Sequence, residues 1–141
     1  FASEEQGLNG SKHFVENWKK GYDKIAAMIN LDCVGYGDSI QVGNGKSAPV
    51  LWGIAKQIDK TSFNSMVNRT WSGGGADATP FHEKGVPCLY FVTTNSYVHL
   101  HLPTDKVETL NSALYEKVVK LAHLTTLEIA NGNYKKEEII K

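Results

Sequence analysis

The sequence lacks an excess of charge of either sign. Lysine plus arginine and aspartate plus glutamate number 15 each, so the formal net charge at pH 7 is zero. A chain without net charge has no long-range field that would recruit nucleic acid or an anionic membrane surface. We therefore expect no nucleic-acid partner, which leaves small molecules and peptides as candidate substrates.

Long apolar runs and cysteine-rich metal motifs are also missing. No run approaches the ~20 apolar residues of a membrane-spanning helix. The amino terminus lacks the basic-then-apolar order of a signal peptide, so we expect any targeting segment to lie upstream of Phe1. The two cysteines, Cys33 and Cys88, lie in apolar strand-like runs rather than in a C-x-x-C spacing. They are expected to be buried free thiols.

Strand-like and helical patterns alternate along the 141 residues, a length that suits one hydrophobic core. This alternation predicts an α/β fold with a mixed, largely parallel sheet flanked by helices. Residues 1–132 form the expected domain, because Gly132 should stop the last helix, and residues 133–141 read as a polar, peripheral tail. The expected strands are Ile25–Val34, Ile40–Val42, Ser65–Trp71 and Val86–Thr93, and the expected helices are 10–20, one beginning at Pro49, a short one at 79–81 and a long one from about residue 110.

Acidic and histidine side chains are placed near the predicted strand ends. Glu4 and Glu5 open the chain ahead of the first helix, Asp32 lies near the carboxyl end of a strand, and His99 and His101 follow the last strand. Ligands of open α/β sheets bind beyond the carboxyl ends of strands, so these segments are expected to converge. Carboxylate and imidazole together suit zinc, and a spare carboxylate beside the metal can act as general base.

Each residue also has a simpler explanation. A glutamate pair before a helix is commonly a solvated feature of its first turn. Asp32 is harder to dismiss, because an unpaired carboxylate in a buried strand costs on the order of several kcal/mol. His99 and His101 would leave the same face of a regular extended segment, so only local loop geometry could single out one of them. The residues after His101 favour that histidine.

Four strings, in this order, carry a family resemblance. They are Glu4 to Ser11, Asn30 to Gly35, Gly75 to Phe81 with Gly85-Val86-Pro87, and His101 to Asp105. Together they resemble the co-catalytic zinc aminopeptidases of the bacterial leucyl aminopeptidase type, from Phe1 to about Asn131. The resemblance implies a zinc-exopeptidase-like fold, two zinc ions in the intact enzyme, and hydrolysis of the peptide bond next to a free amino terminus by metal-activated water.

The resemblance also implies residue roles. Glu4 matches the general base, Glu5 a ligand of one zinc, Asp32 a ligand of the other zinc, and His101 the histidine that shares a metal with Glu5. Asp105 matches a loop or outer position. Asp77 falls in a family Ser-Asp-His string whose serine and histidine are alanines here, so capping of the following helix competes with a role in the site.

The family's other zinc ligands, in a His-x-Asp string, precede the glutamate pair, and no such string precedes Glu4 here. We therefore expect the chain to be the C-terminal part of a catalytic domain without its N-terminal strands, with weak or absent zinc and little activity alone. An unpaired sheet edge would favour a homo-oligomer or pairing with the N-terminal half.

Three alternatives stay open. A zinc-dependent glutaminyl cyclase of the same fold would show the same glutamates, aspartate and histidine with one metal. A non-catalytic relative should have lost ligands, although each one that can be tested is kept, and a purely structural fragment is the third. Phe91, Tyr97 and Leu100 flank the histidine loop and would line either an apolar pocket or the core. The resemblance further implies an extracytoplasmic, periplasmic or secreted, protein.

Overall fold

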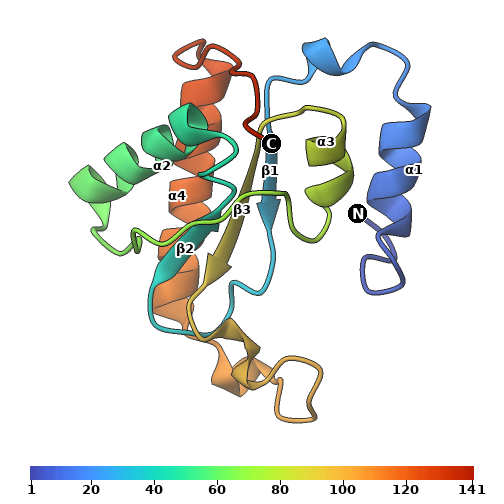
Figure 1. The fold of residues 1–141 in the computed structure, drawn as a ribbon. Coiled ribbons are helices and arrows are strands. Elements are labelled where there is room, and N and C mark those ends of the chain that lie inside the picture. Colours follow the sequence, from blue (N-terminus) through green and yellow to red (C-terminus); the bar gives the residue numbers. More distant parts are fainter.

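The computed structural model describes residues 1–141, in which helices cover both faces of a three-stranded sheet (Figure 1). None of the helices combines the length and apolar character needed to cross a bilayer. Short 3-10 turns occur at Tyr22–Lys24, Ser96–Val98 and Val107–Thr109. The main elements are α1 (Asn9–Asn17), β1 (Met28–Leu31), β2 (Ile40–Gly43), α2 (Pro49–Ser62), α3 (Thr79–Glu83), β3 (Cys88–Thr93) and α4 (Ser112–Ala130).

The sheet has the order β1-β3-β2 and is mixed. β1 runs parallel to β3, with Met28 opposite Cys88 and Leu31 opposite Phe91, whereas β2 is antiparallel to β3. The predicted mixed α/β class is confirmed. Because β1 and β3 are parallel, their carboxyl ends lie at the same edge, as their arrowheads show in Figure 1.

The larger core lies between the sheet and the pair α2 and α4, which pack together on one face (Figure 1). On α4 the buried residues recur at helical spacing, so one side of the helix faces the core. Pro49 occupies the first turn of α2, where its missing N–H costs nothing. The fully buried side chains of this core include Leu51, Phe91, Val118 and Leu121.

A smaller core lies on the opposite face, where α1 and α3 cover the starts of β1 and β3. Val15 and Phe81 come from the helices, and Met28 and Cys88 from the strands. Both cysteines are free thiols, as expected, but only Cys88 is buried, because Cys33 lies in the half-exposed turn after β1.

The expectation of a strand over Ser65–Trp71 is wrong. Only Met66 forms an isolated bridge, to Ile40. The buried Asp59 carboxylate accepts the backbone N–H groups of Ser65 (2.9 Å) and Met66 (3.0 Å). Because a side chain binds these N–H groups and Asn64 is left-handed (φ 47°), the segment runs beside β2 without forming a ladder.

β1 is shorter and more exposed than the expected strand over 25–34. Leu31 is 40% exposed. The reason is position: β1 pairs with β3 alone, so it is an edge strand rather than one buried on both sides.

The segment 133–141 is polar but not peripheral. Tyr134 is buried in the larger core. The Glu137 carboxylate accepts the N–H groups of Val50 (3.0 Å) and Leu51 (2.8 Å) at the amino end of α2. The segment docks because it supplies a cap that α2 otherwise lacks, since no side chain of the Ala48 N-cap can do so. The domain boundary at residue 132 stays a prediction.

Candidate functional site

Glu4 and Glu5 lie in a turn directly before α1. The Leu8 N–H donates to the Glu4 carbonyl at 2.9 Å, and the Gly10 N–H donates to the Ala2 carbonyl at 2.9 Å. A Cβ at Gly10 would lie 2.6 Å from the Ala2 backbone, so glycine is required where the chain crosses the first turn of α1. This crossing fixes the position of the glutamate pair.

Asp32 directly follows β1, and its N–H donates to the Phe91 carbonyl at 3.1 Å, prolonging the parallel pairing. Its carboxylate accepts the Tyr90 hydroxyl (3.3 Å) and the Cys33 thiol (3.3 Å). Burial, reinforced by the Asp32 charge, raises the pKa of Cys33 to about 12 and raises the pKa of Tyr90 as well. Both groups therefore stay protonated at neutral pH and hold Asp32 by donating to it.

His101 meets Glu5 across 96 residues of sequence, with Nε2 2.6 Å from the Glu5 Oε1. Both side chains are open to solvent, at 63% and 68% exposure. The hydrogen bond to Glu5 and its negative charge raise the pKa of His101.

The loop geometry, rather than strand alternation, selects His101. The segment after β3 is not extended, because it contains a 3-10 turn and His101 is left-handed at φ 58°. His99 instead lies edge-on to Tyr36, with ring centroids 4.7 Å apart, and its Nδ1 is 3.0 Å from the Thr104 hydroxyl. The segment is a loop, as expected, and its geometry gives the two imidazoles different partners.

Glu4 is half-buried at the same edge of the sheet. Burial raises the pKa of Glu4, and the negative charges of Asp32, Glu5 and Asp77 raise it further. A carboxylate whose pKa is raised toward the working pH can both take and return a proton. The electrostatics therefore suit Glu4 to general acid–base chemistry.

The donor types match zinc, but the ligand number falls short. Glu5 and His101 form a carboxylate–imidazole pair, and Asp32 offers a further carboxylate nearby. No three His, Cys, Asp or Glu side chains of residues 1–141 are grouped closely enough to hold a metal ion. Catalytic zinc commonly has about three protein ligands. Here only two candidate ligands, Glu5 and His101, contact each other, and Asp32 is not grouped with them.

Two further acids lie around this site. Asp77 does not cap α3, because the N-cap position is Ala78 and no side chain caps the helix. Its buried carboxylate adds to the negative charge that acts on Glu4. Asp105 adds to the negative charge that raises the pKa of His101. Both therefore act on the site electrostatically.

Tyr90 and Cys33 were not singled out from the sequence, yet both hold Asp32. The only available signal was a hydroxyl at alternate spacing with Cys88 and Val92 in an otherwise apolar strand. A buried tyrosine hydroxyl usually needs a hydrogen-bond partner, and the Asp32 carboxylate at the end of the neighbouring strand is that partner here.

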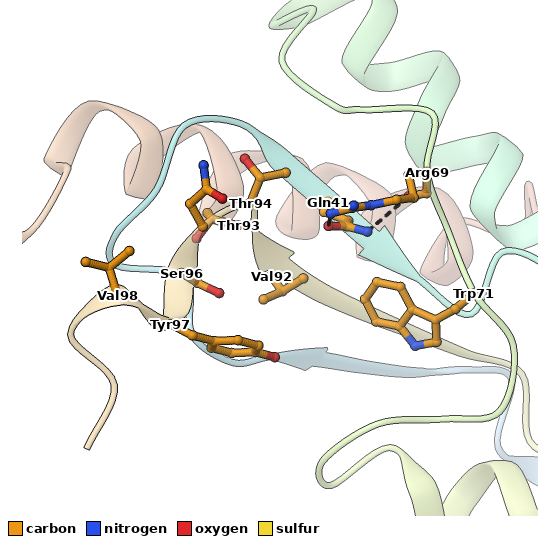
Figure 2. Close-up of a pocket in the computed structure, with 10 residues that line it drawn as sticks. Gln41, Arg69, Trp71, Val92, Thr93, Thr94, Ser96, Tyr97 and Val98 are labelled. Atoms are coloured by element: carbon orange, nitrogen blue, oxygen red, sulfur yellow. Dashed lines mark hydrogen bonds between the residues drawn. The ribbon is translucent and has the colours of Figure 1, made fainter. Parts of the chain in front are cut away.

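Two cavities flank the histidine loop. One of about 200 Å³ is lined by Cys33, Leu100 and Asp105 among others. The other, of about 520 Å³, is bounded by Trp71 and Tyr97 (Figure 2). Tyr97 and Leu100 thus line cavities, whereas Phe91 is fully buried in the core.

Several known proteins are similar to this chain in sequence or in fold. A probable leucine aminopeptidase of Arthroderma benhamiae is 27% identical over 134 residues, which cover 92% of this chain and 38% of the relative. A zinc aminopeptidase structure from Bacillus subtilis superposes with a TM-score of 0.77 at 24% identity, covering all of this chain and 37% of that one. A glutaminyl cyclase from an Acidobacteriales bacterium gives 0.71 at 21% identity, covering 90% and 47%.

The chain thus spans less than two-fifths of the length of the aminopeptidase relative. The model of the family described as Peptidase family M28 nevertheless matches most of the chain, residues 1–126. That range contains Glu4, Glu5, Asp32 and His101. The expected zinc aminopeptidase type is confirmed, and the chain belongs to peptidase family M28.

Proposed function

We propose that residues 1–141 form part of a zinc-dependent aminopeptidase site in which Glu5 and His101 bind one metal ion and Asp32 binds a second. The contact between Glu5 and His101 carries this proposal, because it joins two zinc-type ligands across 96 residues at 2.6 Å. It lies where the parallel strands β1 and β3 end, which is where ligands of such sheets bind.

Zinc, when bound, would supply the Lewis acidity that polarises the scissile carbonyl and favours ionisation of water. Glu4 accepts a proton from the attacking water and delivers it to the nitrogen of the leaving amine. Tyr90 and Cys33 hold the Asp32 carboxylate by donating to its two oxygens. This arrangement fits a substrate with a free amino terminus, whose first side chain would enter a cavity beside the histidine loop.

We further propose that the 141-residue chain binds zinc weakly and hydrolyses peptides slowly or not at all. The support is the ligand count, since only Glu5 and His101 are in contact. The outer edge of β1 has no strand partner within the chain, so it suits pairing with a further strand, from a second copy or from another part of a longer protein.

A glutaminyl cyclase is the second candidate, because a cyclase structure superposes on 90% of the chain. The two activities differ in product. A cyclase closes an amino-terminal glutamine into a ring and releases ammonia, whereas an aminopeptidase releases a free amino acid.

The metal site is tested by zinc titration of the purified chain. Glu5→Gln and His101→Asn should each weaken zinc binding by about tenfold or more, because each removes one ligand of a pair. His99→Asn is the matched control, since it removes a neighbouring imidazole that contacts Thr104. Unchanged zinc affinity in both ligand variants would refute the site.

Activity is tested with a leucine anilide in excess zinc. Glu4→Gln should abolish whatever turnover exists and leave zinc affinity unchanged, because Glu4 moves protons and does not bind metal. Turnover by the chain alone at the 1–1,000 s⁻¹ that is roughly typical of enzymes would disprove the proposed incompleteness.

A further inference from the structure

The cavity of about 520 Å³ contains a single charged side chain, Arg69, which is also the only arginine of the chain. The other lining residues are neutral. A cavity of this kind therefore has a positive charge at one wall and no acid among its lining. Its walls include Gln41, Arg69, Trp71, Val92, Thr94 and Tyr97 (Figure 2).

Gln41 holds Arg69 in place. The Gln41 side chain is 6% exposed, and its Oε1 accepts a hydrogen bond from the Arg69 Nη2 at 3.0 Å. Its Nε2 also donates to the Arg69 carbonyl at 3.4 Å. A buried amide thus fixes both the backbone and the guanidinium of residue 69, while the other guanidinium N–H groups remain to bind a ligand.

No carboxylate of the chain neutralises Arg69, because none of the five ion pairs includes it. The acid close to the cavity rim, Asp38, is hydrogen-bonded to the Asn95 side chain. A guanidinium presents its N–H groups in a planar fork that matches a carboxylate. The ligand chemistry that this wall suits is therefore a carboxylate.

The cavity adjoins the candidate metal site. The Trp71 ring lies edge-on to Tyr90 at 5.7 Å, and the Tyr90 hydroxyl donates to Asp32. Tyr97, on the wall opposite Trp71 in Figure 2, also lies close enough to add to the raised pKa of Tyr90. A ligand between the two aromatic walls would therefore contact the side chains next to Asp32.

The walls also fit the body of an amino acid. Val92 lies between Trp71 and Tyr97 in Figure 2, so an apolar stem can pack there while a charged end reaches Arg69. The hydroxyl of Thr94 adds a hydrogen-bonding group to the lining.

We propose that Arg69 is a specificity-determining residue that binds a carboxylate of the peptide substrate. This inference rests on the proposed aminopeptidase function and names its substrate class. The carboxylate has two sources, an acidic side chain near the amino terminus or the carboxyl end of a short peptide.

The test is an NMR titration of the metal-free 141-residue chain with two matched pairs of dipeptides. The first pair is Glu-Ala amide and Gln-Ala amide, and the second is Ala-Ala acid and Ala-Ala amide. The acidic member of one pair should bind about fivefold more tightly than its neutral partner, with the largest shifts at Arg69 and the Trp71 indole. A preference in the first pair identifies a side-chain carboxylate, and one in the second pair a terminal carboxylate.

Arg69→Gln should remove this preference, and Arg69→Lys should keep part of it, because lysine retains the charge but not the fork. Lys60→Gln, which removes an exposed cation on α2, is the control and should change nothing. Added salt should shrink the preference through screening. The dispersion of the amide spectrum verifies that each variant is folded.

Two results would overturn the assignment: equal binding of both members in both pairs, including no detectable binding, or an acid preference that survives in Arg69→Gln. Because no metal is present, the experiment is independent of the zinc titration. Loss of zinc binding with an intact acid preference would count against the metal site, and the reverse would count against Arg69.

Discussion

The helix-covered face of the sheet and the edge that carries the candidate site differ in how much of their surface residues 1–141 bury. On the face, α2 and α4 bury a cluster of 13 residues, and Leu51, Phe91 and Leu121 have no exposed surface. At the edge, Glu5 and His101 touch while each remains about two-thirds exposed, at 68% and 63%. The core is closed by the chain's own residues, whereas the site is open on one side.

The backbone shows the same contrast. Ser3, Cys33 and His101 have positive φ angles of 56°, 53° and 58°, and each lies next to or at a candidate site residue. A left-handed conformation costs a non-glycine residue roughly 1 kcal/mol or more. The buried residues of α4 have no such cost. Three of the eight non-glycine residues with positive φ thus lie at or next to a candidate site residue, and none of the eight lies in α4.

The largest expected effect is in the core. Leu121→Ala should lower the free energy of unfolding by about 2–5 kcal/mol, because it leaves a cavity in a fully buried position. Leu124→Ala, on the same helix but 36% exposed, is the matched control and should cost less than about 1 kcal/mol. Urea denaturation measures both. Similar losses for the two variants would mean that this core is not closed as described.

A smaller effect is expected where the C-terminal segment meets the core. Glu137→Ala should cost about 1 kcal/mol, because the Val50 and Leu51 N–H groups lose a charged acceptor at the start of α2. The exposed neighbour Glu138→Ala should be nearly neutral. Thermal unfolding compares the two, and equal midpoints would show that the docking is not stabilising.

The smallest effect on stability is expected at the open edge. In the metal-free chain His101 should titrate above its ordinary value, because Glu5 stabilises the imidazolium, and Glu5→Gln should lower its pKa. Since the folded pKa is the raised one, the contribution is complete below the unfolded pKa of about 6.5 and disappears as pH rises through the folded pKa. An NMR titration of the imidazole measures it, with Glu16→Gln as control. An unchanged pKa in Glu5→Gln would contradict the contact.

The sequence predicted those parts of the molecule that depend on periodicity. Leu114, Val118 and Leu121 marked the buried side of α4, and the apolar run around Phe91 marked β3. The convergence of Glu5 with His101 followed from the rule that parallel strands end at one edge and from the family resemblance.

The features that depend on individual hydrogen bonds were not predictable in this way. Asp59 binds the backbone of Ser65 and Met66 and so prevents a strand that the local composition favours. Glu137 reaches α2 over 86 residues of sequence. The different contacts of His99 and His101 depend on a loop that contains a 3-10 turn and a left-handed residue, and only the string that follows His101 favoured that histidine in the sequence. Neither apolar periodicity nor residue type encodes these contacts.

The C-terminal segment, residues 133–141, contacts elements on both faces of the sheet. Besides capping α2 through Glu137, it donates from the Lys136 ammonium to the Tyr22 carbonyl at 2.6 Å, in the connection between α1 and β1. One short segment thus hydrogen-bonds both to α2, on one face of the sheet, and to the connection that follows α1, on the other face. A single proteolytic cut after Gly132 would separate both contacts from the rest of the chain, so we expect it to destabilise the start of α2 and the α1–β1 connection together.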